Sequence, residues 1–429
     1  MFSSRVTPHG GDGRTGAPVD MAAARRSLAG LLATWGLTRL LLLLFVFRVF
    51  VFPGPDVTTD VSVFYQGWYE TLRHGTFPQS DVTWQYPPAA ALAILSPALL
   101  GFLSYAKAFF VLAFLADLAV LLLLLYAGLR PGKTLRGAWV WVAGVPLLGP
   151  TVYARYDVMV TAVAVAGLLA GARRPRLMGA LLAFGAMLKV WPALLLVGAR
   201  RRGAWAWAAA TALAIAAVFA LTMPGSLAFV TFQRNRGTEV ESLGSLVFHV
   251  ARHFGWNGQV LLNYGSVEFL GPYVTLVSSA ALFLTGIAFG WLLLWRLMAT
   301  RFLPNTLADA AFVAVLMFTA TSRVISPQYM VWLVGTAAVC LCFRGSRMRL
   351  PVWLVLAAAF VTVLEFPVWF QHVVMSDTLG ITLLVVRNGL LLVAALLAAV
   401  ELWRSTVPRE PVPPLPAQAT RTRETSTSS

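Results

Sequence analysis

Residues 53–88 form the first long polar interval of the chain and read PGPDVTTDVSVFYQGWYETLRHGTFPQSDVTWQYPP. The apolar run before them, residues 28–52, exceeds the roughly 20 residues that a transmembrane helix needs. The interval holds four of only 17 acidic residues in the 429-residue chain: Asp56, Asp60, Glu70 and Asp81. An acidic loop directly after a membrane-length run is a candidate site for chemistry.

Composition extends the membrane interpretation to most of the chain. Hydrophobic residues make up 59% and charged residues 12%, against roughly 45–50% and 25% in soluble domains. Because lipid offers backbone groups no hydrogen-bond partner, the apolar runs are expected to be helices. The sequence therefore predicts an all-α polytopic membrane domain over residues 28–403. The flanking segments 1–27 and 404–429 are expected to be disordered and cytoplasmic.

The net charge of +16 comes from short basic clusters beside apolar runs, not from a basic stripe or arm. This distribution is typical of the positive-inside rule, so membrane lipids are expected partners and nucleic acid is not. Arg25 and Arg26 place the N-terminal end in the cytoplasm. The interval 53–88 and a second polar interval, 223–271, then lie outside the cell.

Counting crossings by basic-residue parity predicts about ten, with both termini cytoplasmic. Two further segments are expected to be partial elements. Residues 89–104 would form a short helix at the outer face, and 177–199 either a broken hairpin with its apex at 189–192 or a single crossing. Pro192 favours the break, because proline removes a backbone donor. The expected crossings are 28–52, 105–129, 137–152, 158–172, 204–222, 272–298, 306–321, 329–343, 351–371 and 379–403.

This topology gathers unusual polar residues on the outer side, where ionisable groups at membrane depth indicate a functional site. They are Asp60, Tyr86, Pro87, Arg155, Asp157, Lys189, Arg323, Gln328, Tyr329 and His372.

Asp60 permits two interpretations. It precedes a short helical stretch, 61–65, so it could cap the helix amides. As a carboxylate in a partly dry cleft, it could equally be a general base that takes a proton from an acceptor hydroxyl. Asp56, between Pro55 and Val57, is expected to belong to a turn.

The cations also permit two interpretations. Arg155 and Arg323 stand at the ends of apolar runs, where they could snorkel to lipid headgroups. Alternatively they bind a phosphate, which matches the guanidinium fork. Asp157 could instead pair with Arg155. Lys189 stands between Leu188 and Val190, where an ammonium far from the interface needs a partner.

His249 and His253 have the i, i+4 spacing of a metal-binding helix, but no glutamate stands beside them as in zinc proteases. An amphipathic helix at the interface is the preferred interpretation, and no metal is expected. The sequence shows no phosphate-binding glycine loop, dinucleotide-binding pattern or GxSxG elbow in a credible setting. No cofactor and no soluble nucleotide-sugar site are therefore expected.

Five motifs together carry a resemblance to a known family: DVSVFY at 60–65, YPP at 86–88, RYD at 155–157, LKVWP at 188–192 and SPQYMVW at 326–332. In this order they resemble the family-87 glycosyltransferases. These are DUF2029-type membrane proteins with the GT-C fold that include bacterial polyprenyl-phosphate-mannose-dependent α-1,2-mannosyltransferases. The similarity runs through most of residues 28–403.

The resemblance implies a lipid-linked sugar donor, inverting transfer and an essential aspartate in the first outer loop, which maps onto Asp60. Arg236-Gly237 with Glu241-Ser242 resembles a further family stretch, which adds Glu241 to the expected site lining. Many relatives carry Gly-Gln where this chain has Arg155-Tyr156-Asp157, which leaves the donor sugar and the acceptor open.

The expected function is a membrane hexosyltransferase with a GT-C-like bundle of about 10–12 helices in the bacterial plasma membrane. Its donor phosphate would lie near Arg323, with Lys189 or Arg155 assisting, and Asp60 would deprotonate a glycolipid or cell-envelope glycan acceptor. The alternative is a polytopic transporter or lipid flippase without transferase activity, which would also use intramembrane charge. Transporters often have two similar halves, and this sequence shows no such repeat.

Overall fold

The structure is a computed structural model that describes residues 21–234 and 236–408. Residues 1–20 and 409–429, most of the two predicted disordered segments, lie outside the described residues. Helix α1 (Met21–Val46) begins before the expected boundary at Leu28. The cause is local, since the Met-Ala-Ala-Ala-Arg-Arg stretch that opens it consists of strong helix formers.

Six helices of the described chain are long and apolar enough to cross a membrane. This confirms the predicted all-α polytopic membrane fold. They are α1, α4 (Tyr105–Gly128), α8 (Arg202–Thr222), α11 (Val274–Met298), α14 (Arg349–Val363, continued by η6, Leu364–Val368) and α16 (Thr378–Thr406).

The other predicted crossings are shorter and lie inside the bundle. Every residue of α13 from Met330 to Leu341 is buried, and α12 is nearly as enclosed. A segment surrounded by protein does not need the full length of a lipid-exposed helix. The predicted count of ten crossings therefore stays a prediction. These elements are α5 (Arg136–Gly144), η3 (Pro146–Val152), α6 (Asp157–Ala170), α7 (Pro175–Leu188), η4 (Trp191–Gly198), α12 (Thr306–Thr321) and α13 (Tyr329–Leu341).

The segment 177–199 is a broken hairpin, the first of its two predicted alternatives. Helix α7 ends at Leu188, Lys189 is extended with φ −159° and ψ 128°, and η4 starts with a proline in its first turn. Arg174 before α7 and Arg200 after η4 line the same cavity. Both ends of the hairpin therefore lie at the same end of the bundle, and its apex lies at the other.

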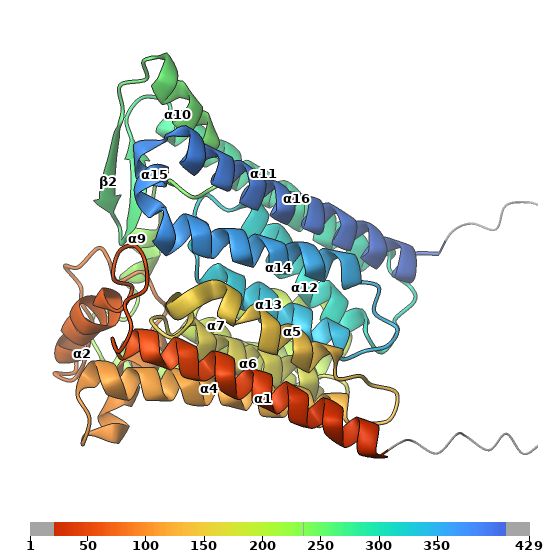
Figure 1. Cartoon of the computed structure of the whole chain (residues 1–429). Helices are drawn as coiled ribbons and strands as arrows, with labels where there is room; N and C mark the ends of the chain where they lie inside the picture. The colour runs from red at the N-terminus through yellow and green to blue at the C-terminus, as the bar shows by residue number, and fades with distance from the viewer. Residues whose placement is uncertain (1–20, 235, 409–429) are drawn as a thin grey trace, which may run out of the picture.

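The two ends of the bundle differ in character (Figure 1). At the terminal end, α1 begins and α16 ends; at the opposite end, here called the loop end, lie α2, α9, α10, α15 and the strands. The predicted short helix of 89–104 is α3 followed by η2, packed into the loop end. The loop-end elements are η1 (Asp60–Tyr65), α2 (Gln66–Leu72), α3 (Ala90–Leu95), η2 (Ser96–Leu100), α9 (Phe229–Arg234), α10 (Leu246–Ala251), η5 (Arg252–Phe254) and α15 (Phe370–Met375).

A small antiparallel sheet in the second polar interval was not predicted. Its strands are β1 (Thr238–Glu239), β2 (Gln259–Asn263) and β3 (Ser266–Leu270), in the order β1-β3-β2. The hairpin between β2 and β3 turns at Tyr264 and Gly265, with φ values of 48° and 77°. Two consecutive positive φ values are typical of the tight turns that join antiparallel strands.

Candidate active site

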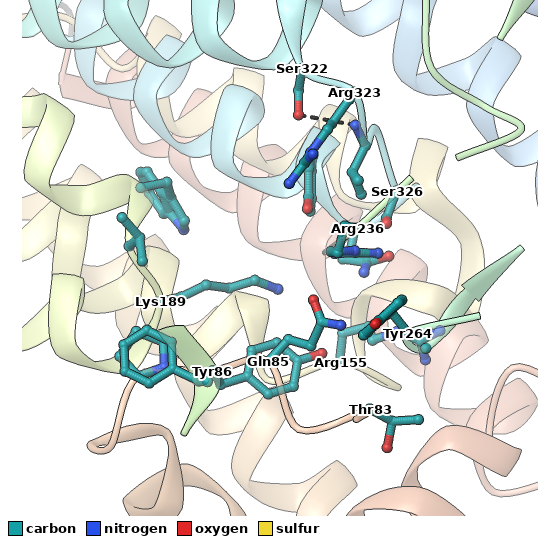
Figure 2. Close-up of a pocket in the computed structure, with 18 of the residues that line it drawn as sticks. Thr83, Gln85, Tyr86, Arg155, Lys189, Arg236, Tyr264, Ser322, Arg323 and Ser326 are labelled. Atoms are coloured by element: carbon teal, nitrogen blue, oxygen red, sulfur yellow. Dashed lines mark hydrogen bonds between the residues drawn. The ribbon is translucent and has the colours of Figure 1, made fainter. Parts of the chain in front are cut away.

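A cavity of about 530 Å³, here called the loop-end cavity, opens at the loop end of the bundle. Among the described residues that line it, one is acidic, Asp60, and four are cationic: Arg155, Lys189, Arg236 and Arg323. They come from η1, the start of α6, the hairpin apex, the approach to β1 and the end of α12. Figure 2 shows Lys189, Arg236 and Arg323 turned toward the same space.

Asp60 forms an ion pair with Arg155. The N-cap position of η1 is Thr59, which makes no capping hydrogen bond through its side chain. The Asp60 carboxylate is 30% exposed, so it is fixed by the guanidinium yet open to the cavity. Arg155 also donates to the Ala154 carbonyl at 3.0 Å and is thereby held in the cavity wall.

Asp56 occupies a turn, as predicted. Its Oδ1 accepts from the Thr58 backbone N–H at 2.9 Å and from the Thr58 hydroxyl at 2.7 Å. Its other oxygen pairs with the exposed Arg48.

Lys189 pairs with Asp157, so the suggested pairing of Asp157 with Arg155 is not the one formed. The ammonium lies 2.8 and 3.0 Å from the two carboxylate oxygens. Trp332 Nε1 donates to Asp157 Oδ1 at 2.6 Å. Asp157 starts α6, where the helix dipole also favours a negative charge. Contrary to expectation, Asp157 is buried and does not line the cavity. Instead, it binds Lys189 and Trp332, which both line it.

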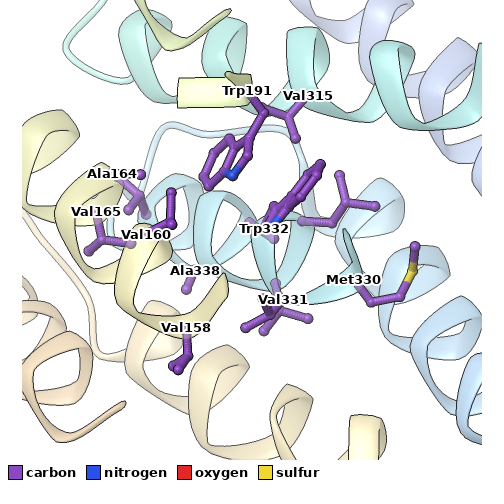
Figure 3. Packing of buried hydrophobic residues seen from close by; sticks show 14 of the residues in the cluster. Val158, Val160, Ala164, Val165, Trp191, Val315, Met330, Val331, Trp332 and Ala338 are labelled. Carbon is purple, nitrogen blue, oxygen red and sulfur yellow. The ribbon is translucent and has the colours of Figure 1, made fainter. Parts of the chain in front are cut away.

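Aromatic rings surround the Lys189 ammonium. Its Nζ lies 5.2–5.7 Å from four ring centroids, those of Tyr86, Tyr156, Tyr329 and Trp332. Such distances give cation–π attraction. Trp332 in turn stacks on Trp191 of η4, with centroids 5.2 Å apart and planes at 14° (Figure 3). Rings from the first polar interval, from the start of α6 and from α13 thus surround the ammonium.

Arg236 was not predicted as a site residue, although it belongs to the Arg236-Gly237 stretch that carries part of the resemblance. Its Nη2 donates to Ser266 Oγ at 2.6 Å, and its Nε lies 3.5 Å from Glu268 Oε1. Arg323 donates to Ser278 Oγ at 3.2 Å. Burial, and then the nearby charge of Arg236, lower the pKa of Arg323. An anion between these two guanidiniums would relieve their mutual repulsion.

Four other expected lining residues face the cavity, and one does not. Tyr86, Pro87, Gln328 and Tyr329 line it. Burial raises the pKa of Tyr86 to about 12, so its phenol stays protonated at neutral pH. Glu241 is buried outside this lining, where Arg387 Nη2 donates to its backbone carbonyl at 2.8 Å. Burial raises the pKa of Glu241 well above its usual value.

The two histidines of the second polar interval bind protein groups. His249 lies 2.8 Å from Ser376 Oγ and 2.7 Å from the Val240 carbonyl, and His253 lies 2.7 Å from the Ser376 carbonyl. They tie α10 and η5 to the turn between α15 and α16. Within the described ranges, no group of three or more His, Cys, Asp or Glu side chains is arranged to hold a metal ion.

Fold and cavity together describe a polytopic membrane protein with a charged, aromatic-walled site at one end. Comparison with protein families identifies its class, since the model of glycosyltransferase family 87 matches residues 84–327, more than half of the chain. The chain belongs to glycosyltransferase family 87 and is a membrane glycosyltransferase. The match includes Arg155, Lys189, Arg236 and Arg323 and begins after Asp60. Searches of curated proteins and of solved structures found no match.

Proposed function

We propose that this glycosyltransferase moves mannose from a polyprenyl-phosphate donor to a lipid-linked or cell-envelope glycan acceptor, with inversion at the anomeric carbon. The reaction would occur at the loop end, on the extracytoplasmic face of a bacterial plasma membrane, in a GT-C-like bundle. The observation that carries the proposal is the set of four cations around the cavity that Asp60 faces. A sugar phosphate is an anionic group that such a set can bind.

The leaving phosphate is the part of the reaction that the cations serve. As the bond from the anomeric carbon to the phosphate oxygen breaks, negative charge grows on the phosphate. Fixed guanidiniums such as Arg323 and Arg236 stabilise that charge without reorganising. Lys189 is held by Asp157 and by its ring of aromatic side chains, so it contributes a positive charge in a constant position.

Asp60 is the proposed general base. An ionised carboxylate has about four lone-pair sites, so pairing with Arg155 leaves acceptor capacity for a substrate hydroxyl. Asp60 takes the proton of that hydroxyl as its oxygen bonds to the anomeric carbon. Attack from the face opposite the leaving phosphate accounts for inversion in a single displacement.

A lipid-linked donor fits the wall of the cavity on the α11 side. Leu282 lines the cavity and is also 52% exposed on the apolar surface of α11. Phe318 of α12 continues this apolar wall. A polyprenyl chain in the bilayer could therefore lie against α11 while its phosphate reaches the cations, and a nucleotide carrier is unnecessary.

The test is to incubate the purified full-length protein with polyprenyl-phosphate-mannose and a membrane glycolipid extract, and to analyse the lipids by mass spectrometry. We expect a lipid that has gained one hexose, together with released polyprenyl phosphate. Transfer from a nucleotide sugar alone would overturn the donor assignment.

The base assignment is tested by Asp60→Asn. Loss of a general base lowers the rate by roughly 10²–10⁴-fold. We expect this loss in the initial rate of transfer by a variant that still folds in detergent. Asp56→Asn is the matched control, since Asp56 lies in the same loop but outside the cavity lining, and it should retain activity. Near-normal transfer by Asp60→Asn would remove Asp60 from this role.

A further inference from the structure

A second cavity, of about 1120 Å³, lies at the terminal end of the bundle, opposite the proposed catalytic site. We call it the terminal-end cavity. Its walls come from the end of α4, the α4–α5 loop, the α6–α7 loop, the η4–α8 junction, the α11–α12 loop and the end of α13. It exceeds the roughly 300–1,000 Å³ of common small-molecule sites.

The charge of this cavity is of one sign. Six basic residues line it, and none of the described residues in its lining is acidic. Within the described part of the chain, none of the six takes part in an ion pair. The six are Arg130, Lys133, Arg173, Arg174, Arg200 and Arg201.

Aromatic rings hold three of these cations at the cavity. Arg130 lies 4.0 Å from the ring centroid of Tyr126, Lys133 lies 2.9 Å from that of Phe343, and Arg200 lies 4.5 Å from that of Phe302. Burial lowers the pKa of Lys133, and the neighbouring charges of Arg130 and Arg173 lower it further. The cations are therefore crowded together, and a bound anion would offset their repulsion.

Apolar side chains of α4, α6 and α7 continue the cavity toward the lipid-facing surface. Tyr126 and Leu177 line it while remaining 65% and 41% exposed. Leu123, Leu169 and Leu181 complete this wall. A ligand that fits must carry negative charge at one end and apolar chains at the other.

The positive-inside rule explains why basic residues gather at this end of the bundle, but it acts on loops one at a time. It does not explain why three separate connections place their cations around one concave space with an apolar wall. Basic pockets between membrane helices are a known form of lipid headgroup site.

We propose that the terminal-end cavity binds an anionic phospholipid. Its phosphate lies among Arg130, Arg174 and Arg200, and its acyl chains lie along α4 and α7. The proposal does not depend on the sugar-transfer reaction, because this cavity lies at the opposite end of the bundle.

The test compares two triple variants of the full-length protein in neutral detergent, with lipid binding followed by native mass spectrometry. The wild type should bind phosphatidylglycerol more than about tenfold more tightly than phosphatidylcholine. The cavity variant R130A/R174A/R200A should lose that preference. The control R136A/R176A/R349A removes the same charge from the same end, from residues outside the lining, and should keep it.

Three outcomes would overturn the proposal: equal binding of the two lipids by the wild type, equal loss of preference in both triple variants, or displacement of phosphatidylglycerol by millimolar inorganic phosphate. The last result would indicate a site for a free anion. If the cavity variant does not fold, Arg173→Ala provides the test. Arg173 is an exposed loop residue of the same lining, and its loss should reduce the preference several-fold.

Discussion

At the scale of single residues, Arg236 differs from the other cations of the loop-end cavity because the sheet sets its position. Its two partners, Ser266 and Glu268, both belong to β3. The Glu268 carboxylate is completely buried and also accepts from Asn263 Nδ2 at 3.0 Å and from the Gly237 N–H at 3.2 Å. The Glu268 carboxylate of β3 thus holds Asn263 of β2, the Gly237 backbone and the Arg236 side chain in place together.

Replacing Arg236 should therefore weaken donor binding. A hydrogen bond to a charged group contributes about 1.5–3 kcal/mol. If the donor is the proposed polyprenyl-phosphate sugar, Arg236→Gln should lower its kcat/KM by about tenfold to a hundredfold, mainly through KM. Initial rates over a range of donor concentrations would measure this effect.

The control is Arg48→Gln, because Arg48 is an exposed loop-end arginine paired with Asp56 and does not line the cavity. Its kinetics should match those of the wild type. An Arg236→Gln variant with unchanged KM would show that this guanidinium does not contact the donor.

Part of the cavity lining could be predicted from the sequence, but Arg236, the positions of Asp157 and Glu241, and the pairing of the charges could not. Basic-residue parity along the chain placed Asp60, Arg155, Lys189 and Arg323 on one side of the membrane, and all four line one cavity. Arg155 and Asp157 stand two apart, and the start of α6 turns their side chains to different partners. A change in direction of this kind arises from local backbone geometry that composition and spacing do not reveal.

At the scale of elements, His249 joins α10 to two other segments of the loop end. Burial lowers the pKa of His249 to about 4. In the unfolded chain the imidazole binds a proton near pH 6.5, whereas the folded chain resists protonation until about pH 4. Protonation therefore favours the unfolded state, and His249 should lower the free energy of unfolding by up to about 3 kcal/mol as the pH falls through this range.

Denaturation of wild type and His249→Gln at several pH values between 4 and about 7 would measure this contribution. The variant should lose less stability on acidification. Burial raises the pKa values of Glu239 and Glu241, which acts in the opposite direction, so the difference between the two proteins is the diagnostic quantity. His74→Gln, at an exposed position, should match the wild type. Parallel profiles of stability against pH for wild type and His249→Gln would show that protonation of His249 does not cause the loss of stability.

Elements could be predicted where hydrophobicity or proline controls them. For the hairpin of α7 and η4, two basic ends and one internal proline left two alternatives, of which the structure has the broken hairpin. The sheet was missed because β1 has only two residues and β2 and β3 have five each, too few to show a clear alternation within a polar interval. Its hairpin turn, Tyr264-Gly265, lacks the Asn-Gly or Asp-Gly signature of the commonest tight turns.

At the scale of the whole molecule, buried ion pairs join helices that are far apart in sequence. Arg39 of α1 donates to both oxygens of Asp117 in α4, at 2.9 and 3.2 Å. It also donates to the carbonyls of Trp141 and Val142 in α5. At the other side of the bundle, Arg387 of α16 pairs with Glu365 of η6. Ionisable residues inside this membrane domain therefore include structural pairs as well as the residues of the candidate site.

The Arg39–Asp117 pair gives a test of this structural role. Trp141 Nε1 and the Tyr153 hydroxyl also donate to Asp117, at 2.6 and 2.7 Å. Asp117→Asn leaves the Arg39 charge buried without its counter-charge, and breaking such a pair costs about 3–5 kcal/mol. We expect a clearly lower unfolding temperature in detergent for this variant. Arg39→Met added to Asp117→Asn should recover most of the loss, because no buried charge remains and the amide oxygen still accepts a hydrogen bond.

The control for that experiment is Glu401, which is partly exposed and lies 3.9 Å from the exposed Arg347 and 3.8 Å from the exposed Arg404. Surface pairs contribute about 0–1 kcal/mol, so Glu401→Gln should change the unfolding temperature little. If the double variant is no more stable than Asp117→Asn, the cost arises from lost hydrogen bonds and not from the unpaired charge. Recovery in the double variant would instead show that α1, α4 and α5 can pack without the ion pair. Each buried charge would then be needed mainly to neutralise the other in a dry interior.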